Sequence, residues 1–191
     1  MPKIKPSAIN LPNALSMGRL LASPLIGWFI ATRQMELAFY VFVCAGLSDA
    51  LDGYLARRLK LLTDMGRIID PLADKALLAT TFVMLGIESF LPWWIVALVV
   101  GRDVLILLAW GISNLFGVRI KPEPALLSKF NTALQIILAA VVLLNAGFNL
   151  EMAMSIKILL YATATTTVLS WLQYLTLWLV TRGTMNKKTD R

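Results

Sequence analysis

The sequence predicts an all-α integral membrane protein with six transmembrane helices, preceded by a segment at the membrane surface. Three observations predict this fold class. Hydrophobic residues make up 58% of the 191 residues, and the mean hydropathy is +0.73. The chain holds six apolar runs, each near the ~20 residues that a helix needs to cross a bilayer. The basic residues gather at the ends of these runs, where they meet lipid headgroups.

The six predicted spans run approximately over residues 11–32, 35–57, 70–90, 92–116, 126–148 and 153–181. Residues 1–10 carry two lysines and a break at Pro6, which predicts an interfacial segment. Residues 182–191 are predicted to form a cytoplasmic tail. No internal repeat is visible, so residues 1–191 are predicted to form a single membrane domain. If the N-terminus is cytoplasmic, the opposite side carries only Arg33 and Lys157, a bias that favours this orientation.

Composition excludes several classes of function. The net charge is +7, but the basic residues do not form a stripe with aromatic residues, so no nucleic acid partner is expected. The chain has no histidine and one cysteine, Cys44. A histidine-based catalytic triad and the usual zinc sites are therefore excluded. Any bound metal is expected to be a hard cation with oxygen ligands, such as Mg²⁺, Mn²⁺ or Ca²⁺.

Four aspartates stand between two apolar runs, at Asp49, Asp52, Asp70 and Asp74. An aspartate at the centre of a membrane helix costs about 2.5–3.5 kcal/mol, so acids in such a chain are candidates for function. The first two are three residues apart and the last two are four apart. On helices, each pair lies on one face, one turn apart. We therefore predict that all four carboxylates bind metal at facing helix ends.

Small residues follow the first aspartate pair. Asp49, Gly53 and Ala56 share one helical face, which leaves room for a flat ligand to approach the backbone. Arg57 is placed to reach a phosphate, and Gly66 is expected in the connecting loop.

The third predicted span has its own start signal. Asp70 is expected to cap it and Pro71 to occupy its first position.

Four carboxylates are more than one metal ion requires. A pair of divalent ions is the arrangement that proteins use to exchange one phosphate ester oxygen for another, with a carboxylate taking the proton of the attacking hydroxyl. One alternative is a salt-bridged network that uses the nearby arginines and Lys75. Another is a divalent-cation transporter, which would need acids on several helices along a path across the membrane.

The motif resembles the signature of the CDP-alcohol phosphatidyltransferase family. It reads Asp49-x2-Asp52-Gly53-x2-Ala56-Arg57-x8-Gly66-x3-Asp70-x3-Asp74. The resemblance implies that family's six-helix membrane fold, a homodimer, and two Mg²⁺ or Mn²⁺ ions held by the four aspartates. It implies Asp70 and Asp74 as catalytic carboxylates, with Asp74 as the base. The implied nucleotide-binding residues are Asn13, Gly53, Ala56, Arg57 and Gly66.

Two later stretches are similar to eukaryotic-type cardiolipin synthases. They are residues 93–107, which contain Gly-Arg-Asp, and residues 121–140, which contain Ser-Lys-x-Asn-Thr-Ala-x-Gln. This resemblance implies that CDP-diacylglycerol and phosphatidylglycerol react to give cardiolipin and CMP. Arg102 and Lys129 are then expected to hold the acceptor's phosphate; the alternative is that Arg102 and Asp103 neutralise each other.

The aspartate motif does not determine which acceptor the protein uses. A phosphatidylglycerophosphate synthase, which uses glycerol 3-phosphate, would share the donor site. In such synthases the fourth helix more often reads Ala-Arg-Glu where this chain has Gly101-Arg102-Asp103.

The expected location is a bacterial inner membrane, with the active site facing the cytoplasm.

Overall fold

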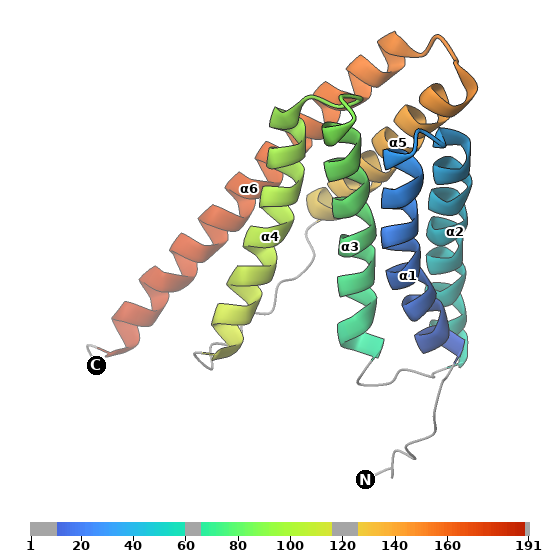
Figure 1. Cartoon of the computed structure of the whole chain (residues 1–191). Helices are drawn as coiled ribbons and strands as arrows, with labels where there is room; N and C mark the ends of the chain where they lie inside the picture. Colours follow the sequence, from blue (N-terminus) through green and yellow to red (C-terminus); the bar gives the residue numbers. More distant parts are fainter. Residues whose placement is uncertain (1–10, 60–65, 116–125, 190–191) are drawn as a thin grey trace. The chain divides into compact units, whose positions relative to one another are not determined.

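All the secondary structure that the computed structural model describes is helical. It describes the backbone of residues 11–59, 66–115 and 126–189, and the side chains of residues 17–48, 73–108 and 126–173. Six helices lie within these ranges, and no strand does (Figure 1). They are α1 (Leu11–Ala31), α2 (Met35–Leu59), α3 (Gly66–Ile87), α4 (Trp93–Leu115), α5 (Leu126–Phe148) and α6 (Ala153–Thr189). The all-α prediction is confirmed, while the interfacial segment 1–10 lies outside the described residues.

The start of α3 differs from the prediction. The helix begins at Gly66, so Asp70 lies inside it and does not cap it. Gly66 is the first helical residue and is not in a loop. The physical reason is that Pro71, the sixth residue of α3, removes a single backbone hydrogen bond, and the other bonds of the helix keep it continuous. Asp70 and Asp74 therefore lie on one continuous helix.

Two helices of the described part are long and apolar enough to cross a membrane. They cover Leu126–Phe148 and Ala153–Gln173, and shorter apolar helical stretches cover Met17–Ala31 and Met35–Ser48. The six-span prediction is therefore not confirmed, although six helices are present. Charged residues inside α3 and α4 interrupt their apolar runs.

The chain divides into two compact units, each described here by itself. The first comprises Met1–Leu91 with Ala139–Glu151, and the second comprises Pro92–Leu138 with Met152–Arg191. In the first unit, α1 packs against both α2 and α3 (Figure 1). The side chains of Ile26 and Phe82 are fully buried in this unit.

Three helices have C-terminal ends in the first unit, and all three end in the same way. Arg33, Ser89 and Asn149 follow α1, α3 and α5 with φ of 61°, 62° and 51°. After α1, the amide of Gln34 donates to the carbonyl of Phe29 at 2.8 Å, which is a Schellman cap. The amide of Phe90 makes the equivalent bond to Leu85 at 2.8 Å, and that of Leu150 to Asn145 at 3.3 Å.

The ends of α1 and α3 are also tied to each other. Arg33 forms an ion pair with Glu88 at 2.6 Å, and its guanidinium lies over the ring of Phe90, 5.2 Å from the centroid.

In the second unit, α4 packs against α6. The rings of Trp94 and Tyr161 stack there with centroids 6.3 Å apart. The helix α6 continues to Thr189, so most of the predicted tail is helical. The prediction of a single domain stays a prediction.

Candidate active site

The four aspartates of the motif lie on two helices of the first unit. Asp49 and Asp52 are on α2, and Asp70 and Asp74 are on α3. Because both elements are helical here, each pair shares one face of its helix, as the spacing predicts. The link 60–65 joins the end of α2 to the start of α3, and Figure 1 shows both at the same end of the unit. The side chains of Asp49, Asp52 and Asp70 lie outside the described residues.

Asp74 is the aspartate whose side chain the structure describes. Its side chain is 41% exposed, and Oδ1 accepts a hydrogen bond from the guanidinium of Arg19 on α1. Arg19 itself is only 3% exposed. A buried arginine on an apolar helix is costly unless it is paired, so the ion pair accounts for its position. The carboxylate is held by a cation and is still open to solvent.

A second polar contact fixes how α1 lies on α3. One turn after Arg19, the hydroxyl of Ser23 donates to the carbonyl of Ala76 at 3.2 Å. It also lies 2.8 Å from the hydroxyl oxygen of Thr80. The register of α1 on α3 therefore brings Arg19 to the level of Asp74. Sequence reasoning gave Arg19 no role. The signal was the one-turn spacing of two polar residues on one face of α1.

The donor set fits a hard divalent cation. Carboxylate oxygens on helix faces are the ligands that Mg²⁺ and Mn²⁺ prefer, and the Asp74 carboxylate is half-exposed. Among the side chains that the structure describes, no group of three or more potential ligands occurs. The other three predicted ligands lie outside that part of the chain. The metal site stays a prediction.

The predicted nucleotide-binding residues lie on the same elements. Gly53, Ala56 and Arg57 are on α2, near its end, and Gly66 opens α3. Asn13 is in the first turn of α1. Their side-chain surroundings lie outside the described residues, so their role stays a prediction.

A groove of about 310 Å³ lies between α1 and α2. Small residues, Gly18, Ala22 and Ala45, line it together with Arg19 and Ser48. Ser48 immediately precedes Asp49 in the chain, so the groove lies beside the segment that carries the first aspartate pair.

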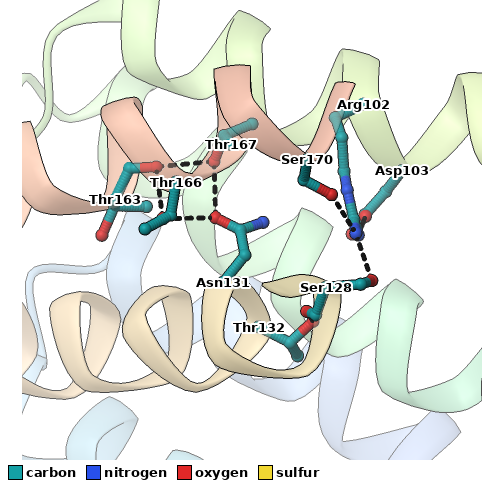
Figure 2. Close-up of polar contacts among 9 residues, drawn as sticks. All are labelled: Arg102, Asp103, Ser128, Asn131, Thr132, Thr163, Thr166, Thr167 and Ser170. Carbon is teal, nitrogen blue, oxygen red and sulfur yellow. Dashed lines mark hydrogen bonds and ion pairs between the residues drawn. The ribbon is translucent and has the colours of Figure 1, made fainter. Parts of the chain in front are cut away.

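The predicted acceptor-binding residues are in the second unit. Arg102 on α4 is 3% exposed and forms an ion pair with its neighbour Asp103 at 2.7 Å. Its guanidinium also donates to the hydroxyls of Ser128 at 2.5 Å and Ser170 at 3.1 Å (Figure 2). Lys129 is exposed. The neutralisation of Arg102 by Asp103 is thus present, and a role for Arg102 and Lys129 in binding phosphate stays a prediction.

The similarity to known proteins is extensive. The model of the CDP-alcohol phosphatidyltransferase family matches residues 9–179. The chain is 35% identical, over 87% of its length and 56% of the relative's, to a chloroplastic CDP-diacylglycerol–glycerol-3-phosphate 3-phosphatidyltransferase of Oryza sativa. It is 31% identical to the human CMP-forming cardiolipin synthase, over 91% of the chain and 63% of that protein.

A bacterial relative is similar over a shorter stretch. The CDP-diacylglycerol–glycerol-3-phosphate 3-phosphatidyltransferase of Aquifex aeolicus is 38% identical over 65% of the chain and 70% of its own length. The chain spans less than two thirds of the rice and human proteins. The match to the family model covers all six helices except the last residues of α6. The chain therefore belongs to the CDP-alcohol phosphatidyltransferase family.

Proposed function

We propose that this chain transfers a phosphatidyl group from CDP-diacylglycerol to phosphatidylglycerol, forming cardiolipin and releasing CMP. The observation that carries the proposal is the position of Asp74. It lies on the motif helix α3, its carboxylate is half-exposed, and the buried Arg19 forms an ion pair with it. Such a carboxylate is fixed in place and is still open to a substrate hydroxyl. The match to the family model supports the same reaction class.

In this proposal Asp74 accepts the proton of the acceptor hydroxyl. The hydroxyl oxygen attacks the phosphorus that carries the diacylglycerol, a new P–O bond forms, and the P–O bond to CMP breaks. CMP leaves with the bridging oxygen, and the proton stays on the carboxylate until solvent removes it. Asp49, Asp52 and Asp70 would hold two divalent ions with Asp74, and bound ions of this kind neutralise phosphate charge.

The remaining residues of the motif would bind the donor. Gly53 and Ala56 would make room for the cytidine, and Arg57 would reach the diphosphate, with Asn13 and Gly66 as further contacts. Their places at the ends of α1, α2 and α3 support one nucleotide site beside the aspartates.

The acceptor is the finer part of the proposal. Cardiolipin synthases from human, rat and fission yeast are 30–32% identical over most of the chain, which supports phosphatidylglycerol. Arg102 and Lys129 would hold the acceptor's phosphate.

A second candidate is glycerol 3-phosphate as the acceptor. The rice and Aquifex relatives, at 35% and 38% identity, carry the name of that activity and favour this candidate.

One assay separates these candidates. Purified protein would be given CDP-diacylglycerol with Mg²⁺ or Mn²⁺, and phosphatidylglycerol or glycerol 3-phosphate in turn. We expect CMP and cardiolipin with phosphatidylglycerol, and no CMP release after chelation of the metal. If product forms with glycerol 3-phosphate and not with phosphatidylglycerol, cardiolipin synthesis is rejected and the second candidate is supported. Synthesis of CDP-diacylglycerol from CMP and cardiolipin would exclude a cation transporter without transferase activity.

We further propose a multi-pass homodimer in a bacterial inner membrane, with all six helices crossing and the aspartates facing the cytoplasm. The chain has one cysteine, so Cys44→Ala gives a background without thiols. A cysteine placed at Ser89, between α3 and α4, should react with an impermeant thiol reagent added outside. One placed at Lys60, after α2, should react only in opened membranes. The reverse pattern would overturn the orientation.

A further inference from the structure

A row of polar side chains, most of them buried, lies along α5 and α6 in the second unit. The members are Ser128, Asn131 and Gln135 on α5, and Thr163, Thr166, Thr167 and Ser170 on α6. They recur every three to four residues, so each set lies along one helix face. Figure 2 shows the row except Gln135, with Asn131 opposite the threonines and Arg102 of α4 near Ser128 and Ser170.

The amide of Asn131 is only half satisfied. Its Oδ1 accepts hydrogen bonds from the hydroxyls of Thr166 and Thr167, both at 2.8 Å. Its Nδ2 has no hydrogen-bond partner, although the side chain is 0% exposed. In Figure 2 this nitrogen points away from the threonines. The hydroxyl of Thr163 is also buried without a partner.

Gln135 is the most unusual member of the row. It lies one turn beyond Asn131, it is 0% exposed, and neither its amide nitrogen nor its amide oxygen has a hydrogen-bond partner. Nε of Arg102 is also buried without a partner. Buried polar groups in proteins are nearly always hydrogen-bonded, so each exception requires an explanation. Several exceptions in one part of the second unit make these groups candidates for contact with a bound ligand.

We propose that Asn131 and Gln135 bind the hydroxyl groups of the acceptor alcohol. This inference rests on the proposed function and extends its acceptor site. A carboxamide offers both donors and an acceptor, as a hydroxyl group does, so the two are complementary. Arg102 supplies a cation at one end of the row for the acceptor's phosphate. Ser128 and Gln135 are about 10 Å apart along α5, a length that takes a phosphate and a three-carbon polyol in line.

The ligand reaches these atoms between α5 and α6. Most of the row is buried in the unliganded chain, and Ser128 and Thr166 are partly exposed. The hydroxyls of Thr166 and Thr167 bond to the amide of Asn131 and join α6 to α5 there. Such bonds between helices in a membrane are weak on average, so a ligand that offers hydroxyl groups can replace them. The hydroxyls of Thr166 and Thr167 then bond to the ligand.

The test is a comparison of Gln135→Met with the unchanged protein. We expect the KM for the acceptor to rise about tenfold, with the KM for CDP-diacylglycerol unchanged. The melting temperature should stay the same or rise, because an apolar side chain of similar size removes an unsatisfied buried amide. A merely structural glutamine, bonded through a buried water, predicts a lower melting temperature and an unchanged acceptor KM. That result would overturn the proposal.

Further variants keep the test decisive. Thr165 is exposed on α6, two residues from Thr163, so Thr165→Val should change neither constant and serves as the matched control. If Gln135→Met does not fold, Gln135→Asn keeps the amide but shortens its reach, and should raise the acceptor KM by a smaller factor. Unchanged acceptor KM in the folded variant, with normal CMP release, would reject this inference alone. Absence of CMP release from the unchanged protein with either acceptor would reject the proposed function.

Discussion

Arg19 on α1 donates a hydrogen bond to Asp74 on α3, and the arginine of this pair is buried while the carboxylate is half-exposed. The two residues are far apart in sequence, and the packing of α1 on α3 brings them together. The exposed part of the carboxylate is available to a substrate, while the arginine restricts how the side chain can turn. Arg19 is therefore a positioning residue for the proposed base.

Replacement of Asp74 by asparagine should abolish turnover. The change keeps the shape of the side chain but removes the proton acceptor, and general-base catalysis contributes about 10²–10⁴-fold to rates. We expect kcat for CMP release to fall by at least about 10²-fold, with normal insertion and an unaltered elution profile in detergent. Glu36→Gln is the comparison and should leave kcat unchanged, since Glu36 is an exposed acid at the start of α2. Retained activity in Asp74→Asn would exclude this residue as the base.

Replacement of Arg19 should act through Asp74. Arg19→Met removes the buried guanidinium, and we expect kcat to fall about 10–100-fold while the KM for CDP-diacylglycerol changes little. Arg19→Lys keeps the positive charge, so it should recover part of the lost rate. The recovery should be incomplete, because lysine lacks the planar guanidinium of arginine. In the Arg19→Met, Asp74→Asn double variant the effects should not add, since one acts through the other. Additive losses would show that Arg19 acts independently of Asp74.

The sequence predicted the helices well, but it did not predict where the side chain of Arg19 would lie. Apolar runs of span length gave four of the six helices to within about two residues at both ends. The predicted start of α3 was wrong, because the Asp70-Pro71 pair resembled a cap and a first helical position, whereas Pro71 is the sixth residue of a helix that begins at Gly66. The motif spacing placed the aspartates on common faces. The partner of Asp74 depends on how α1 lies on α3, which local spacing does not encode.

The polar row of the second unit gives the same lesson. The sequence motif that contains Asn131 and Gln135 was noted only for its similarity to cardiolipin synthases. Gln135 is buried without a partner because of how the helices pack around it, and no pattern within α5 shows this.

Gly147 allows α5 to approach the start of α2, and alanine there should destabilise the protein. A Cβ at this position would lie 2.9 Å from the backbone nitrogen of Glu36 and 3.0 Å from its Cα. Backbone atoms cannot move aside cheaply, and overpacking typically costs about 1–3 kcal/mol. We expect a lower melting temperature for Gly147→Ala. Gly46→Ala is the matched control, because nothing lies within 4 Å of the added Cβ on α2. Gly46→Ala should raise the free energy of unfolding by up to about 1 kcal/mol, because alanine has a higher helix propensity than glycine. Equal destabilisation by Gly147→Ala and Gly46→Ala would contradict this account.

Ser89 follows the end of α3 with a backbone φ of 62°, a conformation that residues other than glycine rarely adopt. Its amide donates to the carbonyl of Gly86 at 3.1 Å, and the next amide, of Phe90, donates to Leu85 at 2.8 Å, so the cap is complete despite the strain. Glycine adopts this φ without strain, and Ser89→Gly should therefore raise stability by up to about 1 kcal/mol. Ser89→Val should lower it by more, because a β-branched side chain tolerates positive φ least. Thermal melting in detergent measures both changes. If Ser89→Gly melts lower than the unchanged protein, the cap is stabilised by the serine side chain and strain is not its main cost.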